Sequence, residues 1–141
     1  MTLRVLAIVG AAWLWGHAAF GACDHPKPVH FAPGAISADL TGGIPRGELD
    51  CYTIGVRQGQ HLTVDQAHAA DSNIVFQLYR PPWSVKTGED GVDVTGTALP
   101  GAEDGSDAKQ WSGALPVRGD YLLVVGTSFG GGEYRLRIEI K

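Results

Sequence analysis

The sequence predicts an all-β fold, an antiparallel β-sandwich of the jelly-roll kind with about seven or eight strands. Beyond the N-terminal segment, no stretch keeps apolar residues at helical spacing for three turns. Instead, apolar and polar residues alternate with a period of two from Ile36 to the C-terminus. The chain of 141 residues contains 20 Gly and 8 Pro for turns, and its 44% hydrophobic content is sufficient for a packed core.

The clearest predicted strand is Glu133–Ile140, in which apolar and charged side chains point to opposite faces. The very apolar run Tyr121–Val125 is expected to be buried on both faces of its sheet. We expect hairpin turns at Gln58-Gly59 and at Arg118-Gly119-Asp120. The other strands are placed near Ala35–Leu40, Leu49–Arg57, Gln60–Asp65, Ile74–Tyr79, Trp111–Leu115 and Tyr121–Thr127.

The N-terminal segment is typical of a secretory signal peptide. Arg4 is followed by an apolar run and then by the small residues around Ala19-Phe20-Gly21, which fit a cleavage site. We therefore expect a signal peptide over residues 1–21, an N-terminal arm over 22–34 and a sandwich domain over 35–141, in the periplasm or outside the cell. A retained membrane anchor is the alternative, but it would need roughly 20 apolar residues, and this segment includes His17.

The two cysteines, Cys23 and Cys51, are predicted to form a disulfide between the N-terminal arm and the first long strand, because an even number of thiols in an oxidising compartment usually pairs. Lipidation at Cys23 is the alternative, and it would leave Cys51 unpaired. However, Phe20 stands where lipidated proteins usually have Leu, three residues before the cysteine. No Cys-x-x-Cys motif is present, which argues against thiol redox chemistry.

Charge and motif content argue against several functions. With 11 basic and 15 acidic residues, the net charge is −4 and no basic cluster exists, so nucleic-acid binding is not expected. The histidines are scattered without metal spacing, and no Gly-x-Ser-x-Gly nucleophile motif occurs. We therefore predict that the protein is not an enzyme and has no stable membrane span.

Residues 80–110 are expected to form a long segment without strands, which is usually functional or disordered. Two similar acidic stretches occur in it, Glu89–Asp93 and Glu103–Asp107. Carboxylates on Gly-containing turns could bind calcium, and the candidate ligands are Asp90, Asp93, Asp104 and Asp107. The alternative is a solvated acidic loop, because neither stretch has the ligand order of an EF-hand. No other cofactor is expected.

Several short motifs together resemble the bacterial periplasmic inhibitors of g-type lysozyme and the wider family of pre-peptidase C-terminal-like β-sandwich modules. The resemblance covers roughly Ala35 to Lys141. The more specific motif is Trp-x-Gly-x-Leu-Pro before Gly-Asp-Tyr, found here as Trp111–Pro116 and Gly119–Tyr121, and it is accompanied by Tyr52–Gln60, Phe76–Tyr79 and Tyr134–Leu136. The resemblance implies a β-sandwich and a non-catalytic module whose partner is a protein such as a lysozyme.

The sequence departs from the inhibitors in one functional loop. In those proteins, the loop between the last two strands is long, bears an Arg and enters the enzyme's cleft, whereas residues 126–133 here are short and contain no Arg. The candidate partner-binding residues are instead Trp83, Ser128 and Phe129, because exposed aromatic side chains are favoured interface anchors. The alternative function is a calcium- or glycan-binding ancillary module or a structural protein of the envelope.

Overall fold

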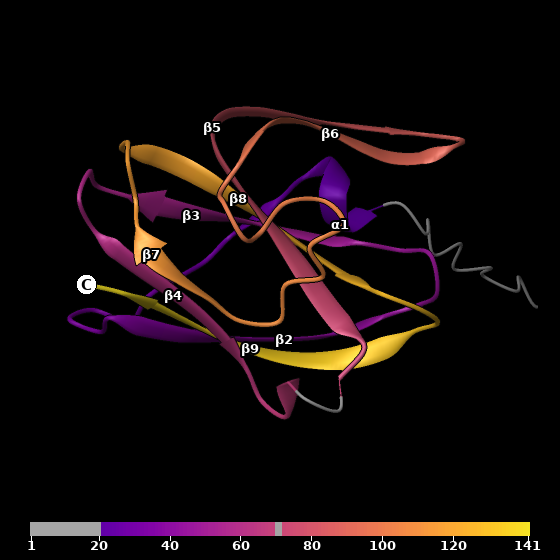
Figure 1. The fold of residues 1–141 in the computed structure, drawn as a ribbon, viewed down its shortest axis with the longest axis horizontal. Coiled ribbons are helices and arrows are strands. Elements are labelled where there is room, and N and C mark those ends of the chain that lie inside the picture. Colours follow the sequence, from indigo (N-terminus) through magenta and orange to yellow (C-terminus); the bar gives the residue numbers. More distant parts are fainter. Residues whose placement is uncertain (1–20, 70–71) are drawn as a thin grey trace, which may run out of the picture.

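The computed structural model describes residues 21–69 and 72–141, in which two β-sheets pack face to face (Figure 1). The expected signal peptide lies outside the described residues except for Gly21. One sheet contains, in spatial order, β1 (Lys27–Pro28), β3 (Asp50–Val56), β8 (Gly119–Thr127), β5 (Ile74–Gly88) and β6 (Gly91–Ala98). The other contains β2 (Ser37–Ile44), β9 (Gly132–Ile140), β4 (His61–Gln66) and β7 (Trp111–Ala114).

The predicted all-β class is confirmed. The nine strands of the described residues slightly exceed the predicted number, and the helical structure in this part of the chain is one turn, α1 (Gly21–Asp24). All neighbouring strands are antiparallel except β1, which pairs with β3 in parallel. None of the helical structure in the described residues is long and apolar enough to span a membrane.

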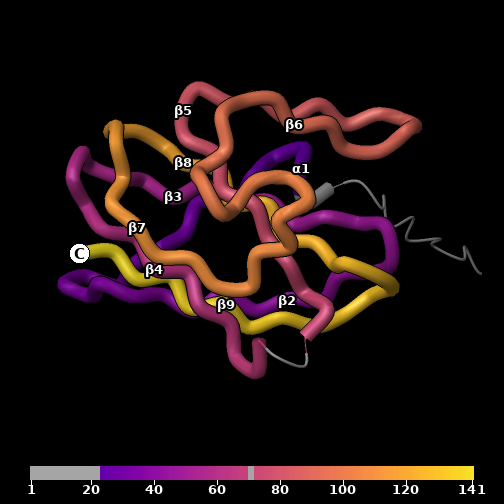
Figure 2. The backbone as a smooth tube through the Cα atoms, viewed as in Figure 1, coloured from indigo at the N-terminus to yellow at the C-terminus, as the bar shows by residue number. Residues whose placement is uncertain are grey.

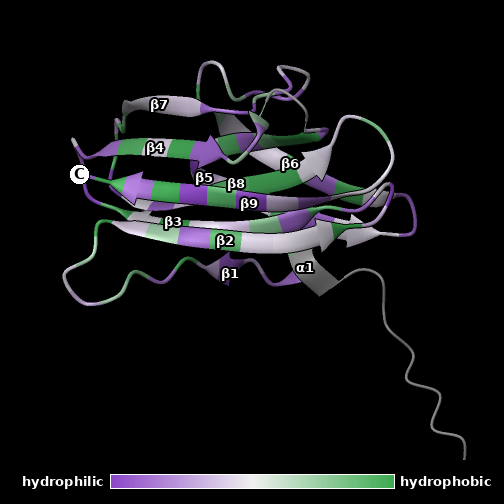
Figure 3. Cartoon of the chain, turned by 90° about the horizontal axis from the view of Figure 1, so that it is seen from below, coloured by the Kyte–Doolittle hydropathy of each residue, from purple (hydrophilic) through white to green (hydrophobic). Residues whose placement is uncertain are grey.

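Strand β9 has the predicted alternation, visible as bands of opposite hydropathy in Figure 3. Its apolar side chains point into the core between the sheets, and its charged ones point outward, between β2 and β4. The predicted double burial of β8 is also confirmed. Tyr121, Leu123 and Val125 belong to the core between the sheets, whereas Leu122 and Val124 belong to a second apolar cluster on the outer face.

The two expected hairpins are wrong. The turn at Gln58-Gly59 joins β3 to β4, and the turn before Gly119 joins β7 to β8, so both connections cross from one sheet to the other. Gly59 has a φ of 85° and Gly119 a φ of 136°, as a tight reversal requires. A glycine turn suits an arch between sheets as well as a hairpin within one, and the turn residues alone therefore could not distinguish them.

The expectation that residues 80–110 form no strand is also wrong. Strand β5 continues to Gly88, turns at Glu89-Asp90 and returns as β6. We call residues 83–96 the β5–β6 ribbon; in Figures 1 and 2 it extends from the upper side of the sandwich. The register shifts between Arg80 and Trp83, at a dipeptide of prolines that have no N–H to donate. This interruption obscured the alternation that continues on its far side.

The rest of this region, residues 99–110, runs along the first half of β5. The Leu78 amide donates to the Ala102 carbonyl at 3.1 Å, and the Phe76 amide donates to the Ala108 carbonyl at 2.9 Å. The side chains of Leu99, Ala102 and Ala108 are buried in the main core. This segment therefore covers an edge of the five-stranded sheet that would otherwise offer unpaired backbone groups.

Candidate functional site

The most exposed large apolar side chain of the described residues is Phe129, with 74% of its surface accessible. It lies in the β8–β9 loop, which we define as residues 128–131. The other exposed large apolar side chain in this part of the chain is Ile36, at 49%. Because Ile36 bonds to Ile140 at the far end of β9, these two side chains lie at opposite ends of the sandwich.

Hydrogen bonds from Asn73, just before β5, hold the β8–β9 loop in place. Its Nδ2 donates to the Phe129 carbonyl at 2.7 Å and to the Gly131 carbonyl at 2.9 Å. Its own carbonyl accepts from the Ser128 amide at 2.8 Å. The backbone beneath Phe129 is therefore constrained while its ring faces solvent, which lowers the entropy lost when the loop binds a partner.

The other two predicted contact residues, Ser128 and Trp83, differ from Phe129 because their side chains donate hydrogen bonds to backbone carbonyls of the chain. The Ser128 hydroxyl donates to the Asn73 carbonyl at 3.3 Å, so it takes part in holding the loop. Trp83 is half-buried, and its Nε1 donates to the Asp120 carbonyl at 2.7 Å. Since Asp120 is the second residue of β8 and Phe129 follows the end of that strand, the structure does not bring Trp83 and Phe129 together.

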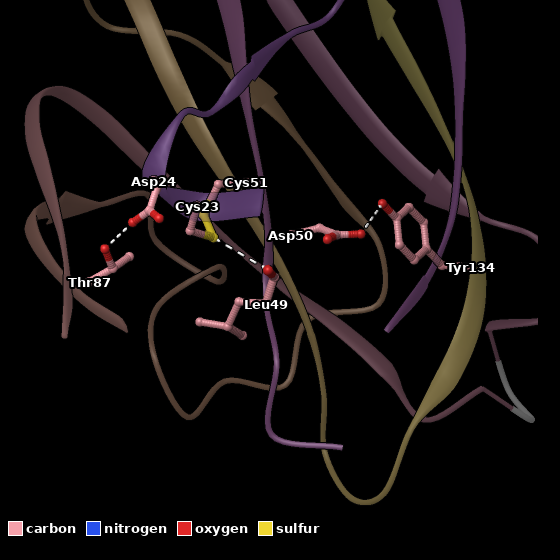
Figure 4. The surroundings of a disulfide bond; sticks show 7 residues. All are labelled: Cys23, Asp24, Leu49, Asp50, Cys51, Thr87 and Tyr134. Atoms are coloured by element: carbon pink, nitrogen blue, oxygen red, sulfur yellow. Dashed lines mark hydrogen bonds between the residues drawn. A yellow bond between two sulfur atoms is a disulfide. The ribbon is translucent and has the colours of Figure 1, made fainter. Parts of the chain in front are cut away.

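The predicted disulfide between Cys23 and Cys51 is confirmed, with an S–S distance of 2.10 Å. Both cysteines are buried in the second cluster, beside Tyr79, Leu122 and Val124. Partly buried side chains of the ribbon pack on the same cluster, namely Trp83, Val85, Val92 and Val94. Asp24, next to Cys23, accepts a hydrogen bond from the ribbon's Thr87 (Figure 4).

The four predicted calcium ligands lie in two different elements. Asp90 is at the turn of the ribbon and Asp93 is on β6, whereas Asp104 and Asp107 are in the segment 99–110. Within residues 21–69 and 72–141, no group of three or more His, Cys, Asp or Glu side chains is arranged to hold a metal ion. Calcium binding therefore stays a prediction from the sequence alone.

Next to the β8–β9 loop, the outer face of the five-stranded sheet has a small cleft of about 170 Å³. Its walls include the apolar side chains of Leu49, Val75 and Val124. The acidic residues of the segment 99–110 line its rim, namely Glu103, Asp104 and Asp107. The cleft therefore combines apolar walls with an acidic rim.

A chain of hydrogen bonds positions one acid of the rim. The Tyr79 hydroxyl donates to Gln77 Oε1 at 2.6 Å, and Gln77 Nε2 donates to Asp104 Oδ1 at 3.1 Å. Burial, and secondly the negative charge of Asp104, raise the pKa of Tyr79. This phenol therefore stays protonated and keeps its role as a donor.

A polar contact joins the two sheets inside the sandwich. Tyr134 on β9 donates to Asp50 Oδ2 on β3 at 2.7 Å (Figure 4), and its oxygen lies 2.5 Å from the Tyr52 hydroxyl. Since the single Tyr134 proton goes to Asp50, Tyr52 donates to Tyr134. Burial, and after it the hydrogen bond to Asp50 and the negative charge of Asp50, raises the pKa of Tyr134. Gly42 makes room for this ring, because a Cβ there would lie 2.6 Å from the Tyr134 hydroxyl.

Two side-chain amides that position the loop and the rim, Asn73 and Gln77, were not among the functional residues predicted from the sequence. Asn73 stands directly before a predicted strand, where Asn commonly bonds to neighbouring backbone. That local signal could have marked it as a structural residue, but its bonding partners are more than 50 positions away in the sequence.

The fold places the chain among two-sheet, mostly antiparallel β-sandwiches. Comparison of the sequence with protein-family models and with curated proteins gives no match. Among solved structures, the chain is similar to Aeromonas hydrophila PliG, a periplasmic lysozyme inhibitor of g-type lysozyme, with 29% identity over 82% of this chain and 96% of that one, and a TM-score of 0.59.

A second solved structure has a similar fold. Salmonella Typhimurium PliG, also a periplasmic inhibitor of g-type lysozyme, is 22% identical over 82% of this chain and 97% of that one, with a TM-score of 0.55. The pre-peptidase C-terminal domain of a Bacillus anthracis collagenase is 11% identical over 83% and 95% of the two chains, with a TM-score of 0.42. The resemblance to the inhibitors of g-type lysozyme, predicted from the short motifs, is thus confirmed.

Proposed function

We propose that this chain is a secreted, non-catalytic module that binds and inhibits a lysozyme, and that the β8–β9 loop is its principal contact. The observation that carries the proposal is the exposed ring of Phe129 on a loop held by Asn73, in a fold similar to that of a g-type lysozyme inhibitor. A constrained aromatic side chain is a typical anchor of a protein interface.

The proposed location is extracytoplasmic. The buried disulfide between Cys23 and Cys51 and the likeness to a periplasmic protein support it, as does the leader-like composition of residues 1–21. In this proposal the mature protein consists of the arm 22–34 and the sandwich domain 35–141. The mass of the exported protein, with and without reduction, tests the cleavage site and distinguishes a disulfide from a lipid at Cys23.

Binding of the mature, disulfide-bonded protein to goose-type, chicken-type and invertebrate-type lysozymes tests the function. We expect binding to at least one type, and we expect Phe129→Ala to weaken it about tenfold or more, the loss of about 1.4 kcal/mol or more that is usual for an anchor residue. Ile36→Ala is the matched control, because it also truncates an exposed apolar side chain but at the opposite end of the sandwich.

Comparing Phe129→Ala with Ile36→Ala distinguishes a loss of binding at the β8–β9 loop from a general effect of truncating an exposed apolar side chain. Equal losses in both would show that the loop is not the contact. If the wild-type protein binds none of the three lysozymes at micromolar concentration, the lysozyme proposal is wrong.

A further inference from the structure

The acidic-rimmed cleft is continuous with the β8–β9 loop. Gly126 and Thr127, the last residues of β8, line the cleft, and the chain proceeds directly from them to Ser128 and Phe129. A partner that covers Phe129 from this side therefore also meets the cleft. The two features form one surface rather than two separate sites.

The interior of the cleft suits an apolar group. Leu49, Val75 and Val124 contribute to its walls, and the absence of a side chain at Gly126 leaves room for that of Leu49. A Cβ on Gly126 would lie 2.7 Å from Leu49 Cδ2, so a larger residue would push that side chain aside. Its volume of about 170 Å³ is several times the roughly 30 Å³ that one water molecule occupies in the liquid. The cleft can therefore receive part of one long side chain.

The rim of the cleft carries unbalanced negative charge. Glu103, Asp104 and Asp107 line it, and none of its lining residues is Lys or Arg. In the described part of the chain, the ion pairs are Arg135 with Asp39 and Lys141 with Glu139, both away from the rim. A cation from a partner would therefore meet carboxylates that form no ion pair within the described part of the chain.

We infer that the partner inserts a Lys or Arg side chain into this cleft while Phe129 contacts an apolar surface beside it. The aliphatic stem of such a side chain matches the apolar walls, and its charged end matches the carboxylates. This inference rests on the proposed function and adds the chemistry of the partner's surface to it. It also implies that the partner's surface is positively charged where it faces the acidic rim. Attraction between these opposite charges accelerates association and makes the association rate sensitive to salt.

The variant that tests this is Glu103→Gln/Asp104→Asn/Asp107→Asn. Each substitution removes a charge but keeps an oxygen that can accept the bonds now made by the Gly101 amide and by Gln77. Asn also tolerates the φ of 50° at Asp107. The matched control is Asp39→Asn/Asp65→Asn/Glu139→Gln, which removes the same charge from strands of the other sheet.

Association and dissociation rates with immobilised goose-type lysozyme are measured from low to high salt. We expect the rim variant to associate about tenfold more slowly at low salt and to lose most of the salt dependence, while the control variant changes little. Phe129→Ala should instead accelerate dissociation and leave the salt dependence intact.

The outcomes distinguish this inference from the proposed function. If the wild-type protein binds and the rim variant behaves like the wild type or like the control, the lysozyme proposal stands and the cleft inference is wrong. If the wild-type protein does not bind, the proposed function fails, and the inference that rests on it fails as well.

Discussion

Tyr134 shows how a single hydroxyl group can join two sheets. Its ring fills the space above Gly42 on a neighbouring strand, and its hydroxyl reaches Asp50 and Tyr52 on the opposite sheet. The cost of burying these polar groups is offset because they bond to one another. The contact therefore specifies how the two layers are aligned at this edge.

Replacing Tyr134 with Phe removes both hydrogen bonds and leaves the Asp50 carboxylate partly buried without its donor. We expect the free energy of unfolding to fall by about 2 kcal/mol, since a bond to a charged group contributes roughly 1.5–3 kcal/mol. Urea denaturation at neutral pH measures this. A loss no larger than that of an exposed control, Phe129→Ala, would show that the contact does not stabilise the fold.

The raised pKa of Tyr134 adds a dependence on pH. In the folded protein the phenol stays protonated, whereas in the unfolded chain it ionises near pH 10. The folded state then binds more protons, so the stabilisation is fully present below about pH 10 and is lost as the pH rises further. We expect the wild-type protein to lose more stability than Tyr134→Phe between pH 9 and 11, measured by urea denaturation. Equal losses would contradict the assignment.

At the scale of elements, the β5–β6 ribbon depends on the N-terminal arm. Its inward side chains pack on the cluster that contains the disulfide, and Thr87 bonds to Asp24 beside Cys23. The arm and the ribbon are far apart in sequence, yet each covers part of the same outer face of the five-stranded sheet. The disulfide thus secures the surface on which the ribbon rests.

Removing the disulfide with Cys23→Ser/Cys51→Ser should lower the free energy of unfolding by about 3.5 kcal/mol, as expected for a closed loop of this length. We also expect faster hydrogen exchange at amides of the ribbon, and little change in β9, which packs in the other cluster. Uniformly faster exchange throughout the sandwich would contradict this separation between the two clusters.

The elements themselves could be predicted where alternation was uninterrupted. Strand β9 and the doubly buried β8 match the prediction because each residue's burial follows directly from the pleat. The β5–β6 ribbon could not be predicted, because two prolines and a register shift separate its alternation of apolar and polar residues from that of the first half of β5. Similarly, Phe129 was identifiable as a candidate, whereas its support by Asn73 depends on a tertiary contact.

At the scale of the whole molecule, the glycine turns could be predicted but not the sheets that they connect. Whether a turn stays in one sheet or crosses to the other depends on how the layers pack, which the local sequence does not specify. The same limit applies to charge. The net charge of −4 argued against nucleic-acid binding, but the position of the acidic rim beside the β8–β9 loop could be found only from the fold.

Inhibition by this protein is measured most simply as the rate of cell-wall lysis by goose-type lysozyme while the mature protein is added. We expect lysis to fall to a low level near equimolar protein at concentrations above the dissociation constant, and we expect Phe129→Ala to require at least about tenfold more protein for the same effect. Lysis that continues unchanged in an excess of the wild-type protein would contradict the claim, as would equal inhibition by the wild type and Phe129→Ala.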